Sequence, residues 1–262
     1  MSMIFLVMEG LMLHCGASSV DYQQVVDSTT PPSTETHYPI PHVKLIEEVR
    51  GQIANSNLTI TEEAHSLTKG GDRYFGLMKL TTGDHDRQDY SAVLGIRNSH
   101  DKKFPSALTI GSSVFVCDNL AFSGEVKLAR RHTRFILRDL PGVVSKTFGQ
   151  LNDAWGIQNK RFDAYKGTDL IDMEAHDLIV RAHRQGGCNA THIAKVADQW
   201  MDPNHPEFQD RNAWSLFNAF TEVLKGNLND LPKRTQSLHA LFDGHCGISL
   251  DKQPILEAEV LN

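Results

Sequence analysis

The spacing of apolar and polar positions changes near residue 140, and this change predicts the fold class. Between residues 58 and 128, short segments alternate apolar and polar side chains and are separated by turn-forming tracts, as the strands of a sheet are. After Pro141 the apolar residues recur at spacings of three and four, which is typical of helices. The pattern therefore predicts an α+β protein, with a β-rich N-terminal half, antiparallel or mixed, followed by a helical C-terminal half.

The expected elements follow from these two periods. One helix is expected over residues 42–54, where the apolar positions keep helical spacing and Asn55 ends the run. A long helix is expected to begin at Asp139-Leu140-Pro141 and to continue for about 25 residues, because proline and an acid are favoured in a first helical turn. Strands are expected over residues 58–61, 74–80, 90–96, 109–117 and 125–128. Shorter helices are expected over residues 172–182, 189–200, 212–225 and 232–242.

These elements divide the chain into four parts. Residues 1–41 form a leader, and its Pro/Ser/Thr-rich end favours extended backbone, since each proline restricts the residue before it. Residues 42–138 form a β-rich core, residues 139–248 a helical region packed on it, and residues 249–262 a tail. Aromatic residues at helical spacing in the helical region are expected to be buried. They are Trp155, Phe162, Trp200, Trp214, Phe217 and Phe220.

Composition favours a globular protein of the cytoplasm. The 262 residues are 40% apolar and 22% charged, which is ordinary for a folded domain. The four cysteines are scattered and include no CxxC pair, so free thiols in a reducing compartment are expected. The apolar start lacks a cationic beginning and is interrupted by Glu9, so it does not predict a signal peptide or a membrane span.

Positive charge gathers in the middle of an acidic chain. The net charge is −6, but the segment from Arg97 to Lys146 holds nine basic and four acidic residues, a net charge of +5, so the remainder carries −11. A basic centre of this kind favours an anionic partner. Phe104 and Phe122 lie in this segment and are candidates for stacking on nucleic-acid bases, or for the core.

Arg130, Arg134 and Arg138 are the first candidate site within the basic centre. Spacings of four and eight keep the three side chains on one face of either a helix or a strand, provided that the segment is regular. Guanidinium groups bind phosphates bidentately, so such a stripe suits a polyanion. The alternative is a solvated face that pairs with acids of the helical region.

The loop Asn98-Ser99-His100-Asp101-Lys102-Lys103 is the second candidate. Asn, Ser and Asp side chains bond their own backbone in turns, so a structural turn is one interpretation. His100 and Asp101 are also suited to acid–base chemistry or metal binding. Both side chains would converge only in a loop, because neighbours on a strand point to opposite faces.

Cysteine and metal chemistry are weakly supported by the sequence. Cys117 ends an apolar run and is most simply a core residue, while nucleophilic catalysis would require His100 or His132 beside it. His-Cys-Gly occurs twice, at residues 14–16 and 245–247, but without the paired spacing of a zinc site. No HExxH, P-loop, GxGxxG, GxSxG or EF-hand motif is present. The sequence thus predicts no cofactor, metal ligand set or catalytic residue.

The stretch LGIRNSHDKKFPSALTIGSSVFVCDNLAFSGEVKLARRHT (residues 94–133) resembles the family called domain of unknown function 932. LHCG (13–16), YPIPH (38–42), RYFG (73–76), EAHDLIVRA (174–182) and AWSLFNAFTEVLKG (213–226) extend the likeness. The resemblance implies a protein carried by phages, prophages or plasmids, in a family whose activity is not established. The positions that carry the core motif are Asn98, Ser99, His100, Asp101, Val116, Cys117, Asn119, Gly124, Glu125 and His132.

The leading hypothesis is a non-enzymatic accessory protein of a phage or plasmid that binds nucleic acid, single-stranded DNA above all. One alternative is a counter-defence module that binds a host protein through the acidic remainder, and another is a metal-assisted hydrolase that uses His100, Asp101 and His132. The sequence leaves homo-oligomers open and predicts no membrane partner. The candidate binding residues are Arg97, His100, Asp101, Lys102, Lys103, Asn119, Lys127, Arg130, Arg131, His132, Arg134 and Arg138.

Overall fold

A computed structural model describes residues 17–81, 90–114, 120–225, 231–249 and 260–261. Its described strands form one sheet whose spatial order follows the chain, from β1 to β7. Neighbouring strands are antiparallel, except that β7 is parallel to β6. The strands are β1 (Ser18–Val20), β2 (Thr59–Leu67), β3 (Arg73–Thr81), β4 (Tyr90–Ser99), β5 (Ser106–Val114), β6 (Leu120–Arg130) and β7 (Val260–Leu261). The predicted α+β class is confirmed.

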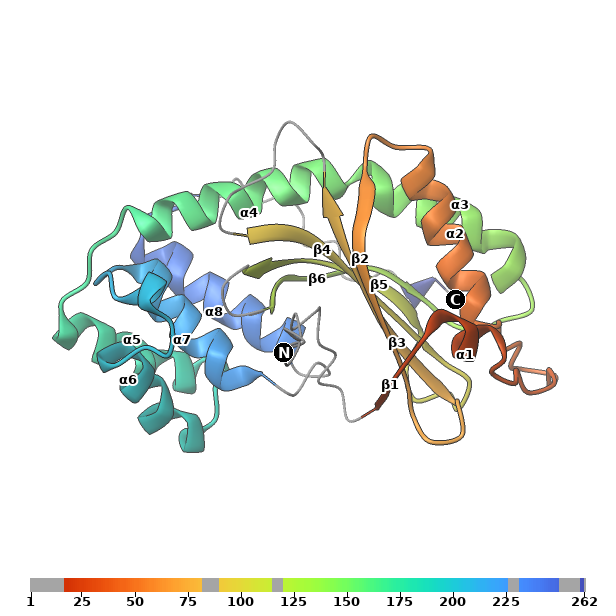
Figure 1. Cartoon of the computed structure of the whole chain (residues 1–262), viewed down its shortest axis with the longest axis horizontal. Helices are drawn as coiled ribbons and strands as arrows, with labels where there is room; N and C mark the ends of the chain where they lie inside the picture. Colours follow the sequence, from red (N-terminus) through yellow and green to blue (C-terminus); the bar gives the residue numbers. More distant parts are fainter. Residues whose placement is uncertain (1–16, 82–89, 115–119, 226–230, 250–259, 262) are drawn as a thin grey trace, which may run out of the picture.

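Helices flank the sheet and then build the end of the molecule that lies away from it (Figure 1). The α-helices are α1 (Tyr22–Val26), α2 (His42–Ala54), α3 (Ile136–Gly149), α4 (Leu151–Lys166), α5 (Asp172–Arg184), α6 (Ile193–Met201), α7 (Ala213–Leu224) and α8 (Leu231–His245). Short 3₁₀ turns cover Ala190–His192 and Pro206–Phe208. None of the helices in the described ranges combines the length and apolar character that crossing a membrane requires.

Several of the predicted elements differ from the structure. β5 begins at Ser106 instead of residue 109, and β6 covers Leu120–Arg130 instead of residues 125–128. The long helix expected after Pro141 is two helices, and the first begins at Ile136, so that Pro141 lies inside α3. The strand expected over residues 58–61 continues to Leu67 as β2. Glu62 and Glu63 interrupt the alternation of apolar and polar residues from which the strand was predicted. Both carboxylates are paired, because Glu62 lies 3.6 Å from Lys79 Nζ and Glu63 forms an ion pair with Arg50 of α2.

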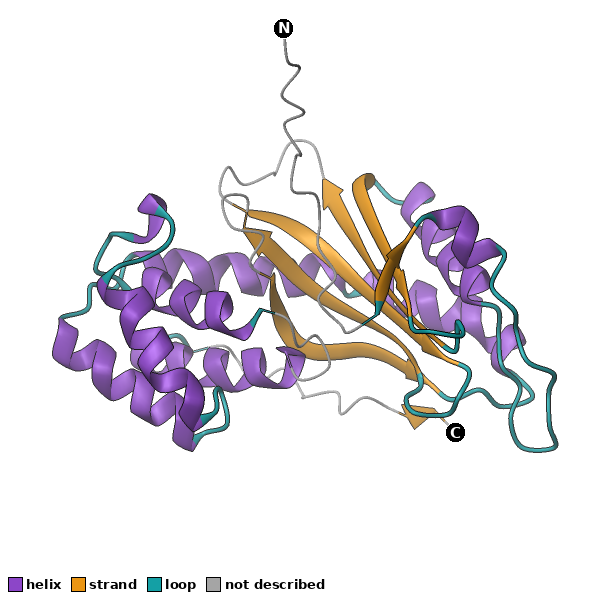
Figure 2. Cartoon of the chain, turned by 60° about the horizontal axis from the view of Figure 1, so that its bottom comes forward, coloured by secondary structure: helices purple, strands orange, loops and turns teal. Residues whose placement is uncertain are grey.

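The two faces of the sheet belong to two hydrophobic cores, because successive strand residues point to opposite sides. Met78 and Leu94 pack against α2, α3 and the start of α4. Leu77 and Val93 belong to the second core, which the rest of α4 and helices α5 to α8 fill. Figure 2 shows the sheet between these two groups of helices. The helical aromatics predicted to be buried are all 8% exposed or less.

Gly76 in β3 makes room for a buried tyrosine, and we expect its replacement to be costly. The Tyr74 hydroxyl lies 2.0 Å from the position that a Cβ on Gly76 would occupy, and it hydrogen-bonds His65 Nδ1 at 2.8 Å. Gly76→Ala should displace the ring, break this bond and lower the free energy of unfolding by about 3 kcal/mol. Gly51→Ala, on α2 with nothing within 4 Å of its Cβ, should instead raise it by about 0.5–1 kcal/mol. Urea unfolding of both variants tests this, and equal stabilities would contradict it.

Candidate functional site

Asn98 is the centre of a buried polar cluster at one end of the sheet. Its Nδ2 donates to the Ile40 carbonyl oxygen at 3.1 Å and lies 2.9 Å from His42 Nδ1. Its Oδ1 accepts from the Ser106 hydroxyl at 2.6 Å and lies 2.8 Å from His132 Nε2. Since Asn98 and Ser106 are wholly buried, each of these bonds replaces water that the groups have lost. The cluster therefore joins the end of the leader to β4, β5 and the segment after β6.

Four imidazole rings pack against one another in this cluster. The rings of His42 and His100 stack with centroids 4.0 Å apart, and those of His37 and His132 stack at 5.2 Å. His100 and His132 meet edge to face at 6.4 Å. His42 Nε2 donates to the Gly71 carbonyl and His100 Nε2 donates to the Ile40 carbonyl, each at 2.8 Å. These acceptors place the ring proton of each histidine on Nε2.

Burial keeps three of these histidines uncharged at neutral pH. Desolvation, reinforced by the neighbouring His100, lowers the pKa of His42 to about 4. Desolvation and the charges of the other histidines lower the pKa of His132 to about 3, and burial also lowers the pKa of His100. The Nδ1 atoms of His100 and His132 are buried without a hydrogen-bond partner among the described residues, none of which would accept a second ring proton there. These three imidazoles are thus neutral and hydrogen-bonded.

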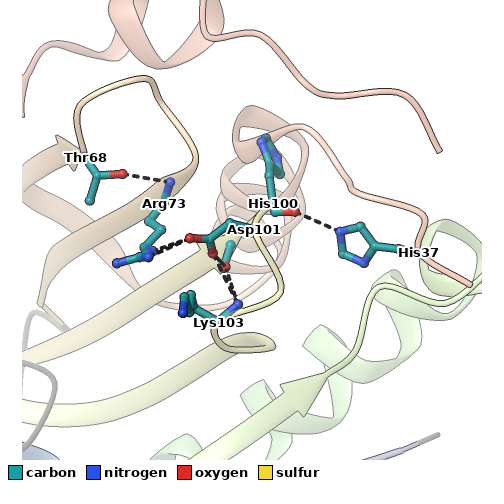
Figure 3. A network of polar contacts seen from close by, with 7 residues as sticks. His37, Thr68, Arg73, His100, Asp101 and Lys103 are labelled. Atoms are coloured by element: carbon teal, nitrogen blue, oxygen red, sulfur yellow. Dashed lines mark hydrogen bonds and ion pairs between the residues drawn. The ribbon is translucent and has the colours of Figure 1, made fainter. Parts of the chain in front are cut away.

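The Asn98–Lys103 loop is a structural turn, as one interpretation of its sequence predicted. Asp101 accepts from the Ser99 hydroxyl at 2.5 Å and from Arg73 Nε at 2.7 Å, and the Lys103 amide closes the turn on it (Figure 3). Although burial raises the pKa of Asp101, the hydrogen bonds from Arg73 and Ser99 outweigh it and hold the pKa at about 2. His100 and Asp101 do not converge, because His100 binds Ile40 and Asp101 binds Arg73.

The predicted stripe of Arg130, Arg134 and Arg138 is wrong, because the segment is not one regular element. β6 ends at Arg130, and α3 begins only at Ile136. Arg130 is 4% exposed, and its Nη2 lies 2.5 Å from Asp139 of α3. This ion pair fits the alternative interpretation, in which the basic centre pairs with an acid of the helical region.

Arg134 and Arg138 are exposed and share an aromatic neighbour. Their guanidinium carbons lie 4.5 Å and 4.3 Å from the ring centroid of Phe135, which is 40% exposed. Leu137 beside them is 56% exposed, and Arg131 is also exposed. Arg138 Nε donates to Asp139 at 2.9 Å, whereas Arg131 and Arg134 form no ion pair with any described residue. We call Arg131, Arg134, Phe135, Leu137 and Arg138 the basic patch.

The other predicted site residues are spread over the same end of the sheet or lie outside the described residues. Arg97 faces the opposite side of β4 from Asn98, over the Phe104 ring at 5.1 Å, and burial lowers its pKa. Lys102 and Lys103 are exposed, and Lys102 has a positive φ of 64°. Asn119 and Cys117 lie outside the described residues, as does the side chain of Lys127.

Metal-binding side chains do not converge among the described residues, where no three of His, Cys, Asp and Glu are placed to hold an ion. Of the two His-Cys-Gly motifs, the first lies outside the described residues. In the second, Cys246 is a free thiol, and burial raises its pKa. In the imidazole cluster, the Nε2 atoms of His37, His42 and His100 each donate to a backbone carbonyl.

The family model for the domain of unknown function DUF932 matches residues 33–240, more than half of the chain. The chain belongs to the DUF932 family. Neither the curated proteins nor the solved structures supply a match. The DUF932 match covers the whole histidine cluster and the whole basic patch.

Sequence reasoning missed three members of the cluster: His37, His42 and Ser106. His42 ends the YPIPH stretch that extends the family likeness, and this was a usable signal. No sequence signal identified His37 or Ser106, because their roles depend on contacts between residues far apart in sequence. His37 Nε2 donates to the His100 carbonyl at 3.0 Å, and the Tyr38 amide donates to the His132 carbonyl at 2.9 Å.

Proposed function

We propose that this DUF932 protein is a non-enzymatic accessory protein of a phage or plasmid, acting in the host cytoplasm, and that its basic patch binds nucleic acid, single-stranded DNA above all. The observation that carries the proposal is the pair of exposed guanidinium groups over one exposed aromatic ring. Single-strand binders combine cations that bind the phosphates with aromatic rings that stack on the bases. In this chain Arg134, Phe135 and Arg138 supply both kinds of group within five consecutive residues.

The histidine cluster supports the patch by fixing the backbone beneath it. His132 is held by Asn98 and Ser106, and the Thr133 carbonyl accepts from the Ile136 amide at 2.9 Å. The ion pair of Arg130 with Asp139 ties the end of β6 to α3. A rigid support keeps the exposed side chains in place, so less entropy is lost when a ligand binds.

Exposed cations of the Asn98–Lys103 loop extend the proposed surface. His100 of this loop meets His132 of the patch segment at 6.4 Å, so the two segments are adjacent. Lys102 and Lys103 are exposed at the tip of the loop. Together with the basic patch they favour a ligand that spans several phosphates.

Fluorescence anisotropy with a labelled oligothymidylate tests the proposal. We expect binding at about 50 mM salt, with a log–log salt slope of about −0.7 for each phosphate contact. Arg134→Ala/Arg138→Ala should weaken binding and make the slope shallower by about 1.4, since two contacts are lost. Phe135→Ala should weaken binding by about 5- to 150-fold with little change in slope, because it removes stacking worth about 1–3 kcal/mol.

The matched control is Arg181→Ala/Arg184→Ala, which removes two exposed arginines from α5. It changes the net charge equally and should leave oligonucleotide binding within about twofold. Absence of binding to single and double strands at about 50 mM salt would refute the proposal, as would equal loss in the control and in the Arg134/Arg138 variant.

A further inference from the structure

The end of the molecule opposite the basic patch carries a hollow of about 440 Å³. It lies where α4 ends, α5 begins and the chain enters α7, and Figure 1 shows α5 and α3 at opposite ends of the long axis. Three carboxylates and two cations line it. They belong to Asp169, Glu174 and Asp210, and to Lys166 and Arg211.

The two cations are directed away from these carboxylates. Lys166 Nζ lies 5.6 Å from the Tyr90 ring centroid and 5.2 Å from that of Trp214. The Arg211 guanidinium lies 4.7 Å from the Trp200 ring centroid and donates to the Trp200 carbonyl. Lys166 and Arg211 also line the hollow, but the carboxylates of Asp169 and Asp210 form no ion pair with the described residues.

Exposed apolar side chains lie beside the hollow. Ile171, which lines it, is 59% exposed, and Met173 is 74% exposed. Asp172 and Asp177 on the same helix are also exposed, but they form ion pairs with Arg211 at 3.9 Å and with Arg181 at 3.5 Å. We call Asp169, Ile171, Met173, Glu174 and Asp210 the acidic patch. Large apolar groups exposed beside carboxylates are typical of a protein interface.

We propose that the basic patch of one copy of the chain docks on the acidic patch of a second copy. The two patches complement each other in both respects, since each combines two exposed large apolar side chains with charges of opposite sign. Arg134 or Arg138 would enter the hollow beside Asp169 and Asp210, while Phe135 and Leu137 would cover Ile171 and Met173.

The position of the two patches makes this contact head to tail. Because they lie at opposite ends of the long axis, they cannot meet within one chain (Figure 1). A contact between different surfaces leaves one basic and one acidic patch unused at the ends of each assembly, so further copies can add. Nucleic acid would compete for the basic patch, so self-association is measured without it.

Sedimentation velocity tests the proposal on the purified full chain. At about 50 mM salt the weight-average sedimentation coefficient should rise with protein concentration, and it should return to the monomer value at about 0.5 M salt, where charges are screened beyond a few ångströms. Arg134→Glu/Arg138→Glu and Asp169→Lys/Asp210→Lys should each weaken self-association at least tenfold. Met173→Gln, at a largely exposed site, should also weaken self-association, because it removes an apolar contact without changing the charge.

Mixing the two reversed variants gives the decisive result. Asp169→Lys/Asp210→Lys keeps the basic patch, and Arg134→Glu/Arg138→Glu keeps the acidic patch. An equimolar mixture of the two variants should therefore form a dimer that neither variant forms alone. Glu47→Lys/Asp153→Lys, which reverses two exposed acids outside both patches, should associate like the wild type. A monomer at every concentration, or a mixture that stays monomeric, would overturn the proposal.

Failure here is distinguishable from failure of nucleic-acid binding. Asp169→Lys/Asp210→Lys should lose self-association yet bind oligothymidylate as well as the wild type. If that variant binds and the wild type never associates, only the docking proposal falls. If the wild type associates but binds no oligonucleotide, only the proposed function falls.

Discussion

Acidification from pH 7 to pH 5 is expected to lower the free energy of unfolding by about 4 kcal/mol through two histidines alone. The pKa values of His42 and His132 are lowered to about 4 and about 3 in the folded chain, against 6.5 for a solvated imidazole. Below pH 6.5 the unfolded chain therefore binds protons that the folded chain does not. Their stabilising effect is complete above pH 6.5 and decreases as the pH falls, by about 1.4 kcal/mol per unit for each histidine. His100, whose pKa is also lowered, acts in the same direction.

Urea unfolding at pH 7.5, 6.5, 5.5 and 5 measures this slope. The window separates the histidines from Glu63 and Asp101, whose pKa values of about 2 make their contributions decline below about pH 4.5. His132→Gln should make the slope shallower by about 1.4 kcal/mol per pH unit, whereas Asn204→Ala, which removes no titratable group from an exposed position, should not change it. Equal stability at pH 7.5 and pH 5 would show that the cluster is solvated or charged.

Asn98→Ala is expected to lower the free energy of unfolding by about 3 kcal/mol at neutral pH. The amide donates to the Ile40 carbonyl and to His42, and it accepts from Ser106 and His132. Alanine leaves His42 Nδ1 without a donor in a site that is wholly buried, and it opens a cavity. Ile40 keeps its bond from His100, which limits the loss.

The midpoint of urea unfolding at pH 7.5 checks this expectation. Asn204→Ala, at an exposed position, is the matched control and should change stability by less than about 0.5 kcal/mol. A loss below about 1 kcal/mol for Asn98→Ala would mean that the amide does not organise the cluster. The same variant should weaken oligonucleotide binding if the cluster holds the basic patch in place.

Local sequence patterns predicted the helices and strands in which buried apolar residues recur at a regular spacing. The helix over residues 42–54 is found with the predicted bounds, because its apolar positions and Asn55 agree on them. The strand β2 was predicted too short because Glu62 and Glu63 interrupt the apolar pattern, and only Lys79 and Arg50, distant in sequence, explain how a strand tolerates them.

The candidate site was predicted only in part of its membership, and its environment was not predicted. The sequence singled out His100 and His132, and the structure brings them together, but inside the protein rather than on an open surface. Their burial depends on the segment from His37 to His42, which lies about 60 residues before His100 and more than 90 before His132, and no spacing rule reports such a contact. The arginine stripe was wrong because the argument assumed a regular element where the chain turns between β6 and α3.

Because the strands lie in the sheet in the same order as in the sequence, the strand order also determines which apolar residues the chain can bury while it is still bound to the ribosome. β2 to β6 each pair with the strand made just before, so these strands can pair before the rest of the chain is synthesised, and β7 joins β6 last. Once residue 155 has emerged, every member of the first core is present, but Leu77 and Val93 on the other face still lack the partners that residues 162–242 supply. A chain stalled on the ribosome between these points would have strands β1 to β6 paired and one apolar face of the sheet exposed, and this is the species on which a chaperone would act.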